Sequence, residues 1–346
     1  MMATATFTPH WRQSQSAAFC LEENSTAGRT VSFSLWGREV KAYANANLSV
    51  ISAQECNADC PFCVEKLRSA SRGISFTRAR PMGEGEYMNR LAAALEALRP
   101  LNPSVSITGG EPSLDPALPR VLALLRMKRA RKLTMTTNGA GLFLQRNGKR
   151  TLDWIIDCGV EKLNISRASA DEARNGRVMR MSDGLDNRDL GKAIALAKAG
   201  GLRPRLSCAL IDGEVDSLDG IMEYVEFARG LGADNVIFRE LMRPEAAAMD
   251  PADPVAQYCQ RKKIPLGPIL ERISQSEEFE FVRQVMGYYY YVEVWRVDGV
   301  DVVFESADLA RIEIMKKLHP AVVHELVFHP GGRLCSTWQA WDGVLG

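Results

Sequence analysis

The sequence has no long apolar run and no excess of charge of either sign. Nowhere do eighteen apolar residues follow one another, and the first residues show no basic start followed by a continuous apolar stretch; the sequence thus predicts neither a membrane-spanning segment nor an export signal. Lysine and arginine number 43 against 42 aspartate and glutamate residues, so no net field draws the chain to DNA, RNA or an anionic membrane. We therefore expect a cytoplasmic protein that binds neither nucleic acid nor membrane.

The eight cysteines do not have the spacing of a disulfide framework. Cys56, Cys60 and Cys63 fall within eight residues, and the other five are scattered. In a large chain without an export signal, this clustering favours a metal site over disulfides. Hydrophobic residues make up 46% and charged residues 25% of the 346 residues, which is ordinary for a globular protein and excludes global disorder. The length favours one α/β barrel with appended pieces.

Short β-branched runs alternate with longer stretches of helical periodicity from about residue 47 onward. This pattern is typical of repeated βα units on a parallel sheet. The predicted strands are 47–52, 104–108, 132–137, 162–166, 203–211 and 235–240. The predicted helices are 84–98, 116–127, 151–158, 187–199 and 217–230. Gly200 and Gly201 are expected to stop one helix before the next strand, and the fold class is therefore α/β with six βα units.

The rhythm changes after about residue 245, because prolines in 249–254 and 264–268 are expected to break regular structure. We expect a β-rich C-terminal module over 246–346 that covers the active site. Asp298-Gly299 between two β-rich runs predicts a hairpin of 288–297 with 300–306, and 322–329 with 333–338 predicts a second one. The N-terminal extension, residues 1–46, is expected to contain a hairpin around Trp36-Gly37.

The segment with the clearest chemistry is Cys56-Asn-Ala-Asp-Cys60-Pro-Phe-Cys63, a CxxxCxxC motif directly after the first predicted strand. Three thiolates this close, in a loop, can converge on one metal centre. Structural zinc usually needs a fourth Cys or His at recognisable spacing, and the nearest histidine in sequence is the distant His10. A [4Fe-4S] cluster held by three cysteines keeps one iron open to another ligand. Free buried cysteines remain as the plain alternative.

This motif, with Phe62 directly before its third cysteine, resembles that of the radical S-adenosylmethionine (SAM) superfamily. Gly109-Gly110-Glu111-Pro112 at the end of the second predicted strand is similar to the family's GGEP segment, where the backbone and the acidic side chain receive the amino group of SAM. Glycine permits close backbone approach, and Glu111 can accept a charge-assisted hydrogen bond from an ammonium group.

The resemblance covers residues 47–243 and is closest to the branch of the molybdenum-cofactor GTP cyclase and the SPASM peptide-modifying enzymes. It implies a partial (β/α)6 parallel barrel over 47–245, with N- and C-terminal β-rich extensions. It also implies SAM and a [4Fe-4S] cluster on Cys56, Cys60 and Cys63 as cofactors. Relatives in that branch bind a second cluster through C-terminal cysteines, but only Cys259 and Cys335 lie there in this chain, so we expect one cluster.

The resemblance further implies that the ends of three strands contact SAM. These candidates are Thr137, Asn138, Asn164 and Ser166, with Leu210, Ile211 and Gly213 for the adenine. Each has an ordinary structural interpretation as well, since Thr-Asn-Gly is a good turn and core packing is equally expected for Leu210 and Ile211.

In the family, a reduced cluster passes one electron to SAM, which yields methionine and a 5′-deoxyadenosyl radical that removes hydrogen from a C–H bond. The resemblance therefore implies an electron donor such as flavodoxin or ferredoxin. As substrate we expect a small polar metabolite or natural-product precursor, and Arg239 and Glu240, at the end of the last predicted barrel strand, are catalytic candidates.

Two other functions stay open at the level of sequence. One is modification or epimerisation of a peptide, with Cys335 as the hydrogen donor. The other is a non-catalytic iron–sulfur redox sensor, which needs no SAM pocket. The aromatic residues Tyr288 to Tyr291, Trp295, Trp338 and Trp341 can stack on a substrate or simply pack a small sheet.

Overall fold

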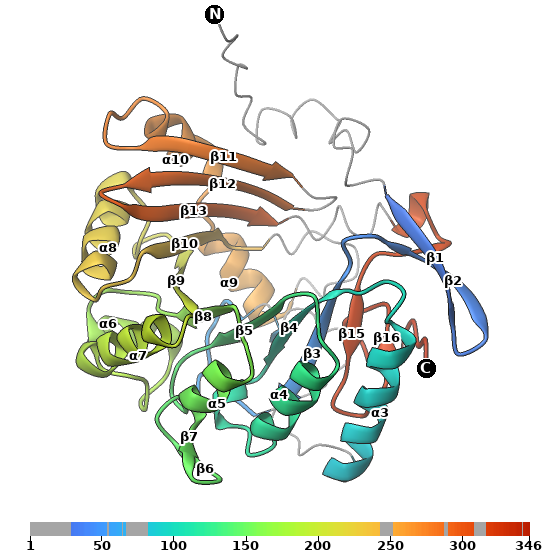
Figure 1. The fold of residues 1–346 in the computed structure, drawn as a ribbon. Helices are drawn as coiled ribbons and strands as arrows, with labels where there is room; N and C mark the ends of the chain where they lie inside the picture. Colours follow the sequence, from blue (N-terminus) through green and yellow to red (C-terminus); the bar gives the residue numbers. More distant parts are fainter. Residues whose placement is uncertain are drawn as a thin grey trace, which may run out of the picture.

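The computed structural model describes residues 29–53, 55–63, 65–66, 82–242, 252–286, 290–307, 316–340 and 342–346. Its centre is a curved sheet with the strand order β11-β12-β13-β10-β9-β8-β5-β4-β3-β15-β16 (Figure 1). The six strands of the βα units are β3 (Asn47–Ala53), β4 (Ser104–Gly109), β5 (Leu133–Thr137), β8 (Lys162–Ser166), β9 (Arg203–Leu210) and β10 (Asn235–Glu240). They are neighbours in chain order and all parallel. The predicted α/β fold with a largely parallel sheet is confirmed.

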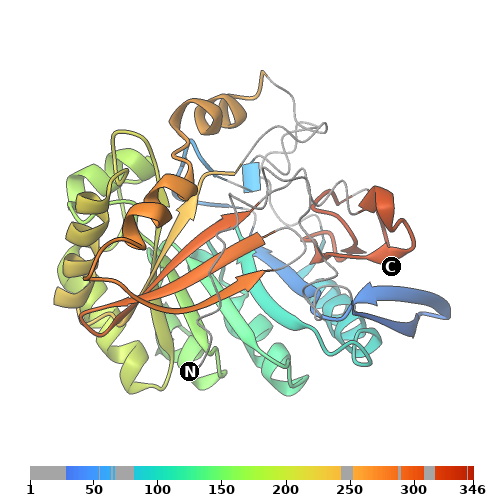
Figure 2. The same ribbon diagram turned by 90° about the horizontal axis from the view of Figure 1, so that it is seen from above.

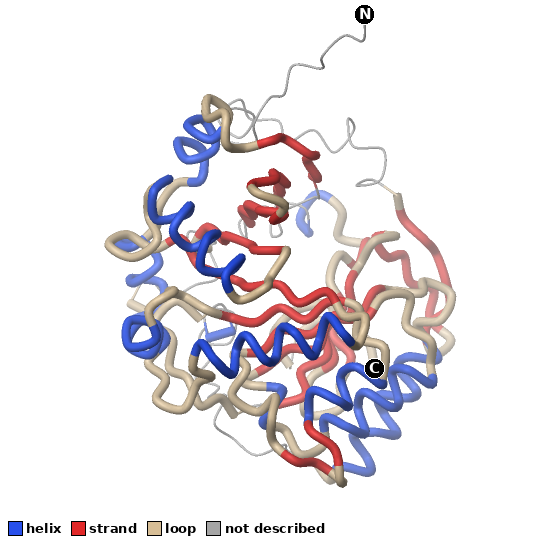
Figure 3. Tube along the Cα trace, turned by 60° about the vertical axis from the view of Figure 1, so that its left-hand side comes forward, coloured by secondary structure: helices blue, strands red, loops and turns tan. Residues whose placement is uncertain are grey.

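Helices cover the outer side of this sheet (Figures 2 and 3). They are α3 (Glu84–Ala97), α4 (Leu118–Met127), α5 (Thr151–Asp157), α6 (Glu172–Met179), α7 (Asn187–Ala199) and α8 (Leu218–Gly230). The predicted stop after α7 is confirmed, since Gly201 takes the left-handed conformation with φ +81°. Helix α6 is absent from the sequence prediction because Arg174, Asn175, Gly176 and Arg177 interrupt its apolar pattern. It begins where the Asp171 side chain accepts a hydrogen bond from the Arg174 N–H.

Two small elements connect the βα units: a 3-10 helix η2 (Pro112–Leu114) follows β4, and a hairpin of β6 (Gln145–Arg146) and β7 (Lys149–Arg150) precedes α5.

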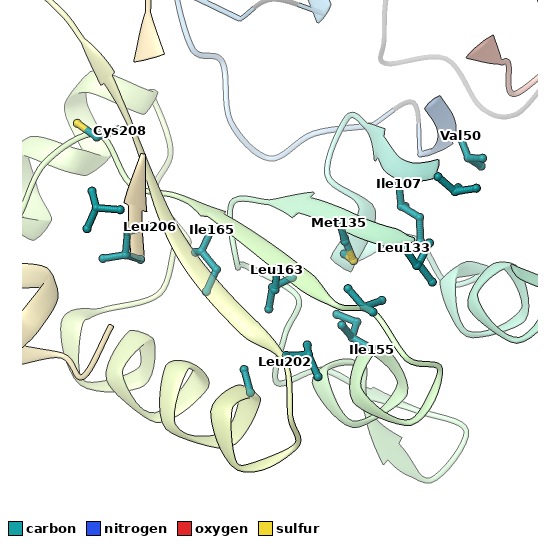
Figure 4. Packing of buried hydrophobic residues seen from close by; sticks show 14 of the residues in the cluster. Val50, Ile107, Leu133, Met135, Ile155, Leu163, Ile165, Leu202, Leu206 and Cys208 are labelled. Atoms are coloured by element: carbon teal, nitrogen blue, oxygen red, sulfur yellow. The ribbon is translucent and has the colours of Figure 1, made fainter. Parts of the chain in front are cut away.

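Alternation along the strands separates an apolar outer face from a polar inner face. Leu163 and Ile165 of β8 are buried in the main core together with helix residues such as Ile155 (Figure 4). Because successive side chains of a strand point to opposite faces, Lys162, Asn164 and Ser166 lie on the inner face of the same strand. Burial of the outer face against the helices provides the main hydrophobic stabilisation, and the inner face is left for polar groups.

The C-terminal strands lie at both edges of the central sheet. The predicted hairpins are confirmed as β12 (Tyr290–Val297) with β13 (Val300–Ala307) and as β15 (Leu326–Phe328) with β16 (Leu334–Cys335). Strand β13 pairs in parallel with β10, β11 (Glu280–Met286) forms the edge beyond β12, and β15 pairs in parallel with β3. With the exception of Val322–Val323, the described strands of the expected module over 246–346 are therefore divided between the two edges and extend the barrel sheet.

The N-terminal hairpin is confirmed as β1 (Thr30–Leu35) with β2 (Arg38–Tyr43), and β14 (Val322–Val323) pairs with β2 to complete a three-stranded sheet. None of the described helices is long and apolar enough to cross a membrane.

The expectation that prolines break regular structure after residue 245 is wrong for two segments. Helix α9 (Pro254–Lys262) begins at Pro254, and Asp253 accepts hydrogen bonds from the N–H groups of Val255 and Ala256. Helix α10 (Leu266–Ile273) holds Pro268 in its first turn. Proline is compatible with a first turn because its missing N–H has no helical partner there. These prolines therefore mark helix starts.

A buried carboxyl group on β12 gives the fold a pH dependence. The Glu293 side chain is fully buried, and it accepts hydrogen bonds from Tyr291 Oη at 2.5 Å and Trp295 Nε1 at 2.8 Å. Burial raises the pKa of Glu293 to about 7. The native state therefore holds a proton that the unfolded state has lost, and the stabilisation present at acidic pH disappears as the pH rises through about 7.

Between pH 5.5 and pH 8.5, we expect the stability of Glu293→Gln relative to wild type to rise by roughly 2 kcal/mol, because only the wild type loses stability as the Glu293 carboxyl is deprotonated. A glutamine stays neutral, and its amide oxygen can accept from Trp295 while Tyr291 reverses its hydroxyl. Urea unfolding at both pH values measures the difference, and Glu226→Gln on the exposed face of α8 is the control. If the difference in unfolding free energy between wild type and Glu293→Gln does not change with pH, the raised pKa of Glu293 is wrong.

Candidate active site

A cavity of about 270 Å³ opens at the carboxyl ends of the parallel strands. Active sites of parallel barrels form at this end of the sheet. Its lining includes Cys56, Cys60, Phe62, Cys63, Gly109, Gly110, Glu111, Thr137, Asn138, Ser166, Arg239 and Glu240. The fold thus brings together the cysteine motif, the GGE segment and three further strand ends, which are far apart in sequence.

The cysteine loop is fixed from several sides. The Ala58 N–H donates to Cys56 Sγ at 3.4 Å, and Cys60 Sγ donates to the carbonyl oxygen of Met179, at the end of α6, at 3.3 Å. Asp59 pairs with Lys66 and, at 3.4 Å, with Arg180. The segment after α6, which the sequence analysis did not single out, therefore helps to hold the loop.

The GGE segment, Gly109-Gly110-Glu111, is hydrogen-bonded to the residues that lead from β3 into the cysteine loop. The Gly110 N–H donates to Ala53 O, and the Glu111 N–H donates to Glu55 O, each at 2.7 Å. Gly109 has φ +126°, and a Cβ atom there would lie 2.3 Å from Ala53 O, which no side chain tolerates. Glycine is needed here for the close approach of two protein segments, next to the cavity.

The Glu111 carboxylate is buried and surrounded by donors from its own protein. It accepts hydrogen bonds from Ser113 N at 2.8 Å, Ser113 Oγ at 2.6 Å, Asn138 N at 2.5 Å and Thr137 Oγ1. Burial raises the pKa of Glu111 in spite of these bonds. Glu111 therefore ties the ends of β4 and β5 together, in addition to lining the cavity. Ser113 was missed, although its place two residues after Glu111 is typical of a local side-chain turn.

The three thiols are protonated in the metal-free protein. Burial raises the pKa of Cys56 to about 11 and that of Cys60 to about 12, and it also raises the pKa of Cys63. Bound metal needs thiolates, so cluster binding must release these protons and be favoured by higher pH. Three sulfur donors on one cavity wall suit an iron–sulfur cluster. No three His, Cys, Asp or Glu side chains among the described residues are arranged around a single metal ion.

The polar strand ends lie at two depths. Asn138 and Ser166 line the cavity, and Asn138 Nδ2 donates to Asn57 Oδ1 at 2.7 Å beside the cysteines. Asn164 lies two residues before Ser166, on the same inner face of β8, and does not line the cavity. Its Nδ2 donates to Thr136 Oγ1 at 3.3 Å, while its Oδ1 is buried without a hydrogen-bond partner among the described residues.

The residues expected around adenine lie beside the cavity and not on its lining. Leu210 is fully buried in the main core, which is the alternative that the sequence left open for it. Ile211 is buried in a smaller cluster that contacts Cys60 and Phe62. Gly213 follows in a turn, and its carbonyl oxygen accepts a hydrogen bond from Arg174 Nη2.

The catalytic candidates Arg239 and Glu240, at the end of β10, line the cavity, whereas Cys335 does not. Arg239 Nε donates to Glu305 Oε1 at 2.8 Å and its Nη1 donates to Ser207 Oγ at 2.6 Å. Glu240 pairs with Lys263 at 3.1 Å. Glu305 lines the cavity too, but it lies on β13 and its register with β10 was not visible in the sequence. Cys335 is fully buried on β16 and is not part of the lining.

The candidate stacking residues have structural roles where they are described. Trp295 is buried in the core, and Trp338 Nε1 donates to Glu325 at 2.9 Å. Tyr288, Tyr289 and Trp341 lie outside the described residues, as does Cys20.

The sequence model of the radical SAM superfamily matches residues 50–228 of the chain, which is more than half of it. The chain belongs to this superfamily. It is a radical SAM enzyme, and the family implies a [4Fe-4S] cluster, SAM, a substrate and a reductant.

Several known proteins are similar to this radical SAM chain. A probable GTP 3′,8-cyclase of Methanococcus maripaludis is 24% identical over 271 residues, which cover 78% of this chain and 77% of that relative. The GTP 3′,8-cyclase of Rhizobium etli is 24% identical over 197 residues, or 56% of this chain and 51% of that one. Both relatives are GTP 3′,8-cyclases, one of the two kinds of enzyme that the sequence motifs resemble.

The crystal structure of SuiB from Streptococcus suis has a TM-score of 0.52 with 14% identity. The match covers 86% of this chain and 61% of SuiB, so this chain spans less than two thirds of that protein. The likeness to SuiB shows the fold alone.

Proposed function

We propose that this enzyme binds one [4Fe-4S] cluster through Cys56, Cys60 and Cys63, and that its substrate is a small polar metabolite or natural-product precursor. When bound, the cluster and SAM supply the 5′-deoxyadenosyl radical that removes hydrogen from the substrate. The observation that carries the proposal is the common cavity, since the three thiols line it together with Glu111, Asn138 and Ser166. A redox sensor has no need of such a cavity.

The residues of the chain would position SAM and exclude water. Ser166 and Asn138 present polar groups toward the cavity, and we propose them as contacts to the ribose and the methionine part of SAM. Glu111 would receive the SAM amino group while holding Thr137 and Ser113 in place. Met179 and Leu241 give the same cavity an apolar side, which limits the entry of water and shields a reactive radical.

We also propose an external reductant of the flavodoxin or ferredoxin type, and we retain the expected cytoplasmic location. Cys56 is exposed as a residue although its thiol is partly shielded from water, so a cluster ligated by it would lie close to the surface that such a donor must approach. The alternative of a peptide substrate with Cys335 as hydrogen donor gains no support from the geometry, because Cys335 lies outside the lining of the cavity.

Anaerobic reconstitution followed by addition of dithionite and SAM tests the proposed function. We expect release of 5′-deoxyadenosine and methionine, and no release when dithionite is left out. A protein that binds its full complement of iron and sulfide but never cleaves SAM would be a redox sensor, and the proposal would be wrong.

The cluster number gives a separate prediction of about four irons per chain. Outside the motif, Cys259 is buried on α9 and Cys335 on β16, while Cys158 and Cys208 are buried in the barrel core. No two of these residues share an element, and the usual cubane has about four cysteine ligands. Iron analysis and Mössbauer spectroscopy measure the content. About eight irons in wild type, with about four remaining in the triple Cys56, Cys60, Cys63 variant, would show a second cluster.

A further inference from the structure

Three cations of the barrel's inner face, on β8, β9 and β10, lie below and beside the cavity; Arg203, on the same face of β9, is mostly exposed and pairs with Glu161 at 3.7 Å. Arg239 of β10 lines the cavity itself. Ser166 pairs in register with Ser207, and both line the cavity. Two residues earlier on each strand, on the same inner face but further from the cavity, Asn164 pairs with Arg205. Lys162 pairs with Arg203 another two residues earlier. Lys162, Arg205 and Arg239 therefore follow one another along the inner face of three adjacent strands.

These cations exceed their counterions. Glu305 is the carboxylate that pairs with Arg239, at 2.8 Å. Burial alone would raise the pKa of Glu305, but Arg239, Arg205 and Lys162 together hold it below the usual value. One carboxylate thus faces three cations. These side chains are partly buried, with about a third of Arg239 and Glu305 exposed, and such an excess of positive charge is unfavourable unless another anion joins it.

Two of the cations have no anionic partner of their own. Arg205 Nε donates to the neutral Asn235 Oδ1 at 2.5 Å, and no ion pair joins Arg205 to a described residue. The Lys162 ammonium group makes neither a hydrogen bond nor an ion pair with the described part of the chain. Burial, followed by the repulsion of Arg205, lowers the pKa of Lys162 to about 7. An anion bound beside Lys162 would reverse part of this shift.

A polar atom and an apolar surface lie on the same inner face of the sheet, below the residues that line the cavity. Asn164 is 8% exposed, and its Oδ1 has no partner among the described residues, so a buried acceptor is left for a donor from elsewhere. On the neighbouring strands, Ile237, Val303 and Val294 form a small apolar cluster. Ile237 and Val303 lie on the inner face, because the residues on either side of each belong to the main core.

We propose that the substrate carries a carboxylate or phosphate group that binds among Lys162, Arg205 and Arg239, and a neighbouring hydroxyl or N–H group that donates to Asn164 Oδ1. This proposal rests on the proposed function, for which it names the substrate class. Arginine forks and a lysine ammonium group are suited to both anions. Asn164, expected from sequence to contact SAM, is thereby assigned to the substrate. The part of the substrate next to the anion would pack on Ile237 and Val303.

The test uses the reconstituted holoenzyme with SAM, at constant ionic strength maintained with sodium chloride. Inorganic phosphate and acetate are the probes, and thermal unfolding is followed as each is added. We expect a saturable rise in melting temperature with at least one of them. In Lys162→Met and Arg205→Met the half-saturating concentration should rise at least tenfold. Lys192→Met on the outer helix α7 removes an exposed lysine and should leave it unchanged.

The outcomes distinguish a phosphate from a carboxylate, and they test the anion site independently of the proposed function. Saturation by phosphate alone indicates a phosphate ester, and saturation by acetate indicates a carboxylate. If wild type shows no saturable effect, or if the two inner-face variants respond like wild type, the anion site is wrong. Release of 5′-deoxyadenosine without substrate is measured in the same samples. Wild type that binds the anion through Lys162 and Arg205 but cannot cleave SAM would disprove the proposed function and leave the anion site intact.

Discussion

Replacement of Cys56, Cys60 or Cys63 by alanine should remove the cluster and all reductive cleavage of SAM while the barrel stays folded. Each change leaves two thiolates for a cluster that has only three from this motif, and two are too few for a stable cubane. The barrel should survive because the three side chains line a cavity and none belongs to the main core. Iron and sulfide analysis, the absorption spectrum, 5′-deoxyadenosine release and circular dichroism together measure these effects.

Cys158→Ala is the matched control for these variants. Cys158 is buried in the main core at the end of α5, away from the lining of the cavity. This variant should keep its cluster and its SAM cleavage, with at most a modest loss of stability from the missing sulfur atom. A full [4Fe-4S] spectrum in the triple variant would show that other residues hold the cluster.

Glu111→Ala should weaken SAM binding and also lower the free energy of unfolding by roughly 3 kcal/mol. The sequence suggests a contact to the SAM amino group alone, which would spare the rest of the protein. In the structure, the same carboxylate accepts four hydrogen bonds from Ser113, Thr137 and Asn138. Its removal leaves buried donors without partners, and the cost of such donors exceeds the loss of an ordinary surface bond.

Equilibrium dialysis with SAM and urea unfolding measure the two effects of Glu111→Ala separately. Ser113→Ala is the comparison, since it removes only the hydroxyl donor and should cost about 1 kcal/mol of stability. Ser166→Ala should weaken SAM binding by roughly 0.5–1.5 kcal/mol without a comparable change in unfolding. Equal stability of wild type and Glu111→Ala would mean that the hydrogen bonds around the carboxylate do not bear on the fold.

Local patterns in the sequence were sufficient for the barrel strands. The bounds predicted for β8, β10 and α7 agree with the structure residue by residue, because each strand is a short run built around buried apolar residues and α7 has an apolar stripe. The starts of α9 and α10 were missed, since proline was interpreted only as a breaker and the capping role of Asp253 was overlooked. The parallel pairing of β13 with β10 joins segments far apart in the chain, and no local pattern encodes such a contact.

In the site, too, residues in local motifs could be predicted, and residues brought in by pairing of distant strands could not. The cysteine motif, Glu111 and Ser166 could be found because they stand at fixed places in contiguous motifs. Glu305 could not, since it reaches Arg239 only through the pairing of β13 with β10. The inner-face cations were also missed. Lys162 and Arg205 look like ordinary exposed residues of alternating strands until the curvature of the sheet encloses them.

The pairing of Leu48 with Leu326 has a consequence for the order in which the molecule is made. Strand β3 leaves the ribosome early, but the strand that covers its outer edge is synthesised only after the whole barrel. Until then, an apolar strand with an unpaired edge is open to pairing with other chains. Contacts between such distant segments also form slowly. Because the cavity around the cysteine loop is lined also by Glu305 and Ala307 of β13, the cluster site is complete only when nearly the whole chain has been made.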